Sequence, residues 1–85
     1  MEWPAIRKIF PDQWLLVEAL DAHSHSGKRV LVDLAVMNSF PDGLAAIEKY
    51  RKLRSRAPER EFYVLHTGRE VLEISELSWL GLRPS

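Results

Sequence analysis

The sequence predicts a two-layer α+β domain in which antiparallel strands form a sheet and one helix packs on that sheet. Three observations lead to this prediction. Two apolar stretches at 13–20 and 29–37 have the composition and alternation of β-strands. A stretch with helix-start residues follows them, and two further strand-like stretches follow the helix. The expected order is therefore β-β-α-β-β, and the 85 residues are expected to form one domain, 1–85.

The first two strands are expected to form an antiparallel hairpin. Residues 13–20 read QWLLVEAL, and apolar side chains on both faces are typical of a strand that is covered on both sides. Residues 29–37 read RVLVDLAVM, and one face of this strand is entirely apolar. Residues 21–28, DAHSHSGK, are expected to form the connecting loop, although eight residues exceed the usual length of a hairpin loop.

A helix is expected after the second strand. The run Ser39-Phe40-Pro41-Asp42 is a helix start signal, because the Ser39 side chain can accept a hydrogen bond from the Asp42 amide. Pro41 is tolerated there, since the first turn has no intrahelical partner for its missing N–H. The helix then runs through GLAAIEKYRKLRSR and stops before Pro58.

The helix and the second strand are expected to pack on each other. The helix has a stripe of apolar side chains at helical spacing, and the strand has its unbroken apolar face. On this reading Val32→Asp unfolds the domain, because an unpaired charge in a core costs several kcal/mol. The facing residues are Ile47, Tyr50 and Leu53 on the helix and Val30, Val32, Leu34 and Val36 on the strand.

The last two strands are expected to form a second hairpin. Residues 61–67 (EFYVLHT) and 70–74 (EVLEI) flank Gly68-Arg69, which suits a two-residue turn with glycine first. Residues 75–85 form an apolar C-terminal tail, and residues 1–12, which contain two prolines, are expected to be irregular.

Composition excludes several classes of protein. Hydrophobic residues make up 46% of the chain, and 12 basic and 12 acidic residues cancel, so the chain lacks the signature of disorder. There is no cysteine, which excludes disulfides, thiolate nucleophiles and cysteine-ligated zinc. No apolar run approaches the roughly 18 residues of a membrane span. The N-terminus lacks the pattern of a secretory signal, so we expect a cytoplasmic protein without membrane contact.

The residues that most often carry catalysis are present in patterns too weak to indicate an enzyme. Glu18 and Asp33 lie on the two strands of the first hairpin and are candidates for an acid–base pair, but the competing interpretation is a polar sheet face. His23 and His25 form an H-x-H pair in a loop rich in serine, with His66 far along the chain. We therefore expect no catalytic residue, no metal ion and no cofactor, and the sequence assigns no role to the three histidines.

The helix offers one alternative function. Residues 42–60 contain six basic and three acidic side chains, a local charge of plus three. A nucleic-acid-binding regulatory or antitoxin-like protein could use helix residues 44–56 to contact phosphates, with Lys49, Arg51 and Arg54 as candidates. Against this, the charges spread around the helix and the total charge is zero, so a solvated helix is the simpler interpretation.

Apolar side chains that one helix cannot cover indicate an interaction surface. One helix covers a single face of a four-stranded sheet, which leaves Leu15 and Val17 in need of another cover, and the tail adds further apolar residues. The sequence therefore predicts a small protein-interaction module that acts with a partner protein or as a homodimer. A tail folded back on its own sheet, in a monomer, is the competing account. The candidate interface residues of the tail are Trp79, Leu80 and Leu82.

The chain also resembles a family of small uncharacterised bacterial β-β-α-β proteins. The resemblance runs from Phe10 to Ile74, over FPDQWLLVEAL, RVLVDLAVMNSFPD, AAIEKYRKLR and EFYVLHTGREVLEI. Such proteins are often encoded beside a retropepsin-like protease or a toxin–antitoxin-like gene. The resemblance implies a prokaryotic, cytoplasmic protein that works with a partner, and it carries over no active-site residue.

Overall fold

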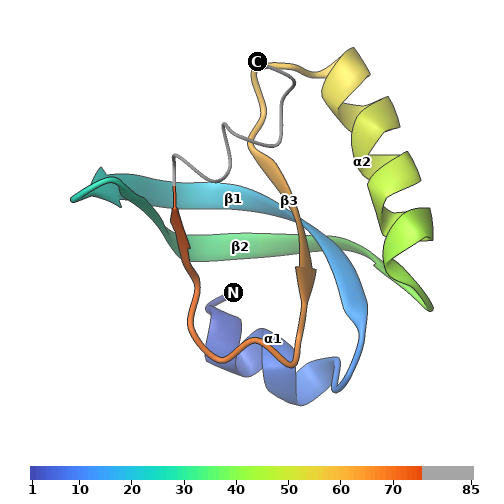
Figure 1. Ribbon diagram of the computed structural model, residues 1–85, viewed down its shortest axis with the longest axis horizontal. Helices are drawn as coiled ribbons and strands as arrows, with labels where there is room; N and C mark the ends of the chain where they lie inside the picture. Colours follow the sequence, from blue (N-terminus) through green and yellow to red (C-terminus); the bar gives the residue numbers. More distant parts are fainter. Residues whose placement is uncertain (76–85) are drawn as a thin grey trace.

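The computed structural model describes residues 1–75 as a curved antiparallel sheet with two helices (Figure 1). The strands lie in the order β3-β1-β2-β4. The predicted α+β class, with a helix packed on the sheet, is confirmed. The tail residues 76–85, and with them Trp79, Leu80 and Leu82, lie outside the described part of the chain. The elements are α1 (Trp3–Ile9), β1 (Trp14–His25), β2 (Lys28–Phe40), α2 (Gly43–Arg56), β3 (Phe62–His66) and β4 (Glu73–Ser75).

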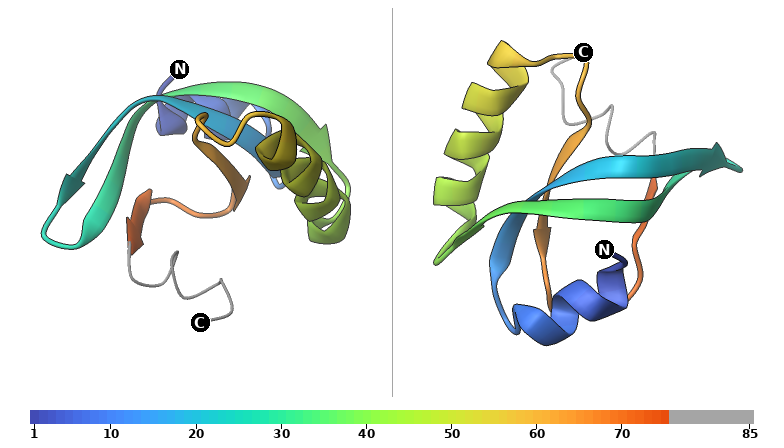
Figure 2. Two further views of the ribbon diagram at one scale, coloured as in Figure 1. Left: turned by 90° about the horizontal axis from the view of Figure 1, so that it is seen from above. Right: turned by 180° about the vertical axis from the view of Figure 1, so that it is seen from behind.

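The first hairpin is confirmed, but it is longer than predicted. β1 and β2 continue to a two-residue turn at Ser26 and Gly27, so the expected loop at 21–28 is wrong. Both turn residues have positive φ, 50° and 75°, which gives the tight turn that matches the twist of an antiparallel pair. The outer part of this hairpin reaches away from both helices (Figure 2).

Residues 1–12 are not irregular, because most of them form α1. Pro4 lies in the first turn, where its missing N–H breaks no helical hydrogen bond. Trp3 and Ile6 are three residues apart and therefore share one face of the helix, and both are buried. α1 thus supplies a second helical cover for the sheet, which the proline-rich sequence had hidden.

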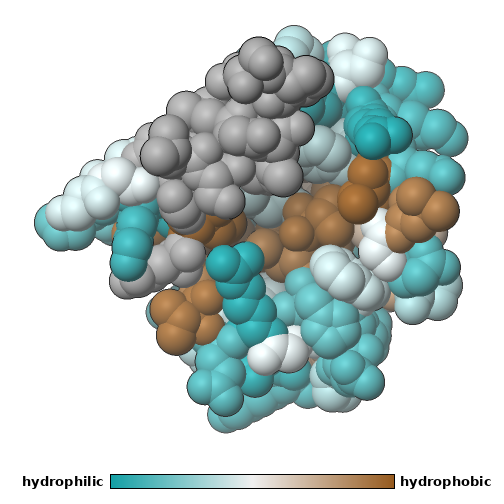
Figure 3. All heavy atoms as spheres, viewed as in Figure 1, coloured by the Kyte–Doolittle hydropathy of each residue, from teal (hydrophilic) through white to brown (hydrophobic). Residues whose placement is uncertain are grey.

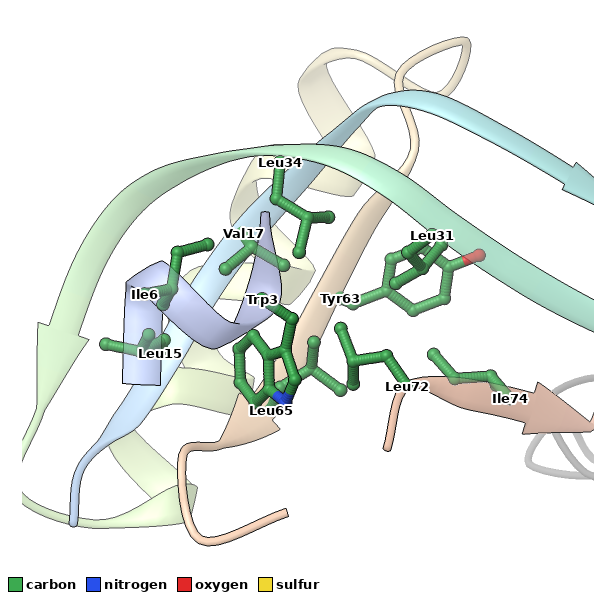
Figure 4. Close-up of a cluster of buried hydrophobic side chains, with 10 residues drawn as sticks. All are labelled: Trp3, Ile6, Leu15, Val17, Leu31, Leu34, Tyr63, Leu65, Leu72 and Ile74. Carbon is green, nitrogen blue, oxygen red and sulfur yellow. The ribbon is translucent and has the colours of Figure 1, made fainter. Parts of the chain in front are cut away.

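The main core lies between α1, the sheet and the segment that leads to β4 (Figure 4). Trp3 and Ile6 pack with Leu15 and Val17 of β1, whose side chains have no exposed surface. Leu15 and Val17 are therefore core residues, and the prediction that a second copy covers them is wrong. The other members of this cluster are Leu31, Leu34, Tyr63, Leu65, Leu72 and Ile74.

α2 covers the opposite face of the sheet at the root of the hairpin. Leu16 and Trp14 alternate with the core residue Leu15 and so point to this face. Gly43, the first residue of α2, lies against the Trp14 ring: a Cβ at this position would be 3.3 Å from it. Ala46 of α2 is fully buried. No helix among residues 1–75 is long and apolar enough to cross a membrane.

The helix start differs from the prediction by three residues. Asp42, not Ser39, is the N-cap, and its Oδ1 accepts a hydrogen bond from the Ala45 amide at 2.8 Å. Ser39 still belongs to β2. The predicted end holds, since α2 stops at Arg56, two residues before Pro58.

The second predicted hairpin does not form. β3 pairs with β1, from Trp14↔His66 to Glu18↔Phe62, whereas β4 pairs with β2 on the far side of the sheet. The indole N–H of Trp3 donates to the carbonyl of Arg69 at 2.6 Å, so α1 holds the connecting segment away from β3. Burial of Leu72 in the core accompanies this crossing.

The expected contact between the apolar face of β2 and the helix stripe is only partly present. The ladder between β1 and β2 shifts register near Val32, which has no partner in β1. Such a bulge changes the face to which the following side chains point. Leu31 and Leu34, three residues apart, therefore both reach the core, while Val32 and Ile47 are each 39% exposed.

Candidate functional site

The outer half of β1 has one edge without a backbone partner. β3 pairs with β1 only as far as Glu18, and the Ala19 amide then donates to the Glu61 carbonyl at 2.8 Å. Beyond that point, no residue in the described part of the chain pairs with this side of β1. We call residues 20–25 the open edge. The corresponding side of β2 is occupied by β4 at 28–30 and by Met1 at Leu34.

The turn geometry decides which backbone groups of the open edge point outward. In an antiparallel hairpin with a two-residue turn, the pair that closes the turn exchanges hydrogen bonds, and every second pair does so after it. The closing pair here is His25↔Lys28, and the next such pair is His23↔Val30. The N–H and C=O groups of Ser24 and Ala22 therefore point away from β2, into the space beside the sheet.

The side chains of the open edge are mostly exposed, and one of them, Asp21, is charged. Asp21, His23 and His25 alternate along β1 with Ala22 and Ser24. The side chains of these three residues therefore share one face of the sheet. Leu20, which has no partner in β2, is 58% exposed. Lysine and proline commonly prevent pairing at free edges, and residues 20–25 contain neither. In Figure 3 the tip of the hairpin, at the left of the view, is hydrophilic.

Two bidentate ion pairs lie at the start of β3, next to the point where the open edge of β1 begins. Arg29 of β2 holds both carboxylate oxygens of Glu61, with N–O distances of 2.7 and 3.0 Å. Arg60 holds both oxygens of Glu18. Because the planar guanidinium group matches a carboxylate, each pair sets orientation as well as distance.

These ion pairs change the proton affinities of the groups involved. The Arg29 guanidinium, by its hydrogen bonds, lowers the pKa of the Glu61 carboxyl below its usual value. The Tyr63 hydroxyl donates to the same carboxylate, and burial raises the pKa of Tyr63 above its usual value. The hydrogen bonds from Arg60 likewise lower the pKa of Glu18. The carboxylates are thus held ionised by arginine partners, which is an anchoring arrangement.

The structure does not bring Glu18 and Asp33 together as an acid–base pair. Glu18 lies opposite Ala35 and is bound by Arg60, whereas Asp33 lies opposite Asp21. The Asp33 carboxylate accepts a hydrogen bond from the N-terminal amine of Met1 at 2.6 Å. Each carboxylate therefore has its own cation.

The three histidines also lie in different places. His23 and His25 are exposed on the open edge. The Nδ1 atom of His66 accepts a hydrogen bond from the Gly68 amide at 3.0 Å, and its ring meets Trp14 edge-on at 5.1 Å between centroids. Among residues 1–75, no group of three histidine or carboxylate side chains is placed to hold a metal ion.

The basic candidates on α2 are exposed, as the alternative function requires. Lys49, Arg51 and Arg54 all face solvent. Arg54 donates to the Tyr50 hydroxyl at 3.2 Å, and none of the three has a carboxylate partner within the described residues. Figure 3 shows hydrophilic surface along the outer side of α2 and a hydrophobic band between α2 and β3.

Sequence reasoning missed the open edge because most of its residues are polar. Leu20 and Ala22 are its apolar residues, and although Ala22 packs partly against the main core, hydrophobic periodicity carries little signal there. The turn itself is the available signal: the pair Ser26-Gly27 suits a two-residue hairpin, which extends the first strand through 21–25 and starts the second at Lys28. Comparison of the chain with protein-family models, curated proteins and solved structures gave no match.

Proposed function

We propose that this protein is a small interaction module that binds an extended segment of a protein partner along the open edge of β1, without catalysis of its own. The observation that carries the proposal is the outward direction of the backbone groups of Ala22 and Ser24, at a strand edge with which no residue of 1–75 pairs. A peptide that adds a strand to such an edge gains main-chain hydrogen bonds for affinity and side-chain contacts for specificity.

The hairpin is also held firmly enough to act as a docking edge. On one side of the sheet, Arg29 ties β2 to Glu61 at the start of β3. On the other, Arg60 ties the same end of β3 to Glu18 of β1. β4 supports the far edge of the hairpin at residues 28–30. A preorganised edge loses less conformational entropy on binding than a flexible loop would.

Panning of random nine-residue peptides on the immobilised full chain tests this proposal. We expect selected peptides to lose binding to Ser24→Pro, which removes one outward amide, by roughly 10-fold or more, and to keep binding to Ser24→Ala. Proline is tolerated at a strand edge whose N–H faces solvent, so the fold is expected to survive and is checked by circular dichroism. Peptides that bind both variants equally would place the binding surface elsewhere.

Nucleic-acid binding through α2 is the second candidate. The specific observation in its favour is the exposure of Lys49, Arg51 and Arg54 without carboxylate partners in residues 1–75. The test is fluorescence anisotropy with a labelled 20-base-pair duplex. Binding that weakens steeply between 50 and 200 mM salt, and that is lost when the three residues are changed to alanine, would favour this function. Absence of binding at 50 mM salt would remove it.

A further inference from the structure

We propose that the strand that fills the open edge is the same edge of a second copy, paired antiparallel about a two-fold axis at His23. This inference rests on the proposed function and names its partner. The resulting dimer joins the two sheets into one continuous sheet, with the two β1 strands side by side at its centre.

The backbone favours this register over the one centred on Ala22. With the axis at His23, Ala22 of each copy lies opposite Ser24 of the other. Both outward-pointing residues of each chain then exchange hydrogen bonds, which gives four bonds across the axis. An axis at Ala22 would pair Ala22 with itself and place Ser24 opposite the bulged residue Leu20, where the regular ladder is interrupted.

The charges are complementary in the same register. Asp21 of one copy lies opposite His25 of the other, and the two-fold axis repeats this pair. A carboxylate opposite an imidazole can accept its N–H, whereas like charges directly opposite each other destabilise a sheet. Parallel pairing of the two edges in register would place Asp21 opposite Asp21 and His25 opposite His25, whereas the antiparallel register leaves a single like pair, His23 opposite His23 on the axis. The edge is therefore self-complementary in the antiparallel arrangement.

Within residues 1–75, the position of the hairpin tip is compatible with a second copy. The views of Figures 1 and 2 agree that the tip of the hairpin lies away from α1 and α2. The paired segment is short, and an interface of this size lies well below that of stable complexes. We therefore expect a reversible dimer with a dissociation constant on the order of 10–1000 µM.

Sedimentation equilibrium of the full chain between about 10 µM and 1 mM tests the dimer and its register. We expect the wild-type mass to rise from 9.8 kDa toward twice that value. His25→Asp places two carboxylates opposite each other and is expected to weaken the dimer by roughly 10-fold. The double variant Asp21→His with His25→Asp restores the opposite pairs, and we expect its dimer to recover to within about 2-fold of wild type. Thermal unfolding of each variant shows that the exposed changes leave the fold intact.

The outcomes separate this inference from the function on which it rests. A wild type that remains at 9.8 kDa at 1 mM overturns the second copy as partner. Peptide binding that depends on the Ser24 amide would in that case leave the proposed function standing. A dimer that His25→Asp does not weaken, or that the double variant does not restore, overturns the register. A dimer that Ser24→Pro leaves unchanged overturns the open edge as the dimer interface, and the peptide experiment then decides the proposed function by itself.

Discussion

Leu34→Asp is expected to unfold the chain, whereas Val32→Asp is expected to leave it folded. Leu34 is 1% exposed and belongs to the main core, so a carboxylate there would be desolvated among apolar side chains. An unpaired buried charge costs several kcal/mol, which is comparable to the whole stability of a small domain, about 5–15 kcal/mol. Val32 is 39% exposed at the bulge, and we expect a cost of about 1 kcal/mol or less.

Far-UV circular dichroism and urea unfolding of the two variants measure this difference. The two variants are well matched, because both residues lie on β2, two positions apart. In both variants aspartate replaces an aliphatic residue. The same unfolding free energy in both variants would show that the bulge does not direct these side chains to different surroundings. Unfolding of both variants would restore the simple alternation that the sequence predicts, in which Val32 and Leu34 share one buried face.

Glu61→Gln is expected to lower the free energy of unfolding by about 1–3 kcal/mol at neutral pH, because it breaks charged hydrogen bonds to Arg29 and Tyr63. The effect depends on pH. The pKa of Glu61 is lowered in the folded state, so its stabilisation is fully present above the unfolded pKa of about 4.3 and is lost as pH falls through the lower folded value.

Urea unfolding at pH 7 and at pH 3 measures this dependence. We expect the gap between wild type and Glu61→Gln to narrow at the lower pH. Glu70→Gln is the matched control: it makes the same chemical change at an exposed residue, and we expect a difference within about 0.5 kcal/mol. A gap of equal size at both pH values would mean that the ionised carboxylate is not what stabilises the start of β3.

The sequence was informative where side chains are buried in a regular pattern. Alternation at 29–37 and the helix that ends before Pro58 predicted β2 and α2 well. Alternation could not predict that Leu31 and Leu34 reach the same core, because a bulge between them interrupts the period of two. Nor could it assign β4 to β2, since this pairing depends on the path of residues 68–72 past α1.

The helices that pack on the sheet show a second limit of prediction from the sequence. The sequence identifies Leu15 and Val17 as side chains that need a cover. It predicts an interface with a second chain at these residues because it predicts only one helix. α1 provides much of that cover from a segment whose prolines favour a turn. The open edge is the opposite case, because its mostly polar residues form a strand mainly through backbone hydrogen bonds and a tight turn.

Amide hydrogen exchange of residues 22–25 tests the central claim most directly. In dilute solution, where the chain is monomeric, we expect the His23 and His25 amides to exchange slowly and those of Ala22 and Ser24 to exchange rapidly, because only the first pair is bonded within the hairpin. At about 1 mM chain, we expect the Ala22 and Ser24 amides to become protected. Rapid exchange of all four amides would show a loop in place of the strand, and slow exchange of all four in dilute solution would show an edge that is already covered.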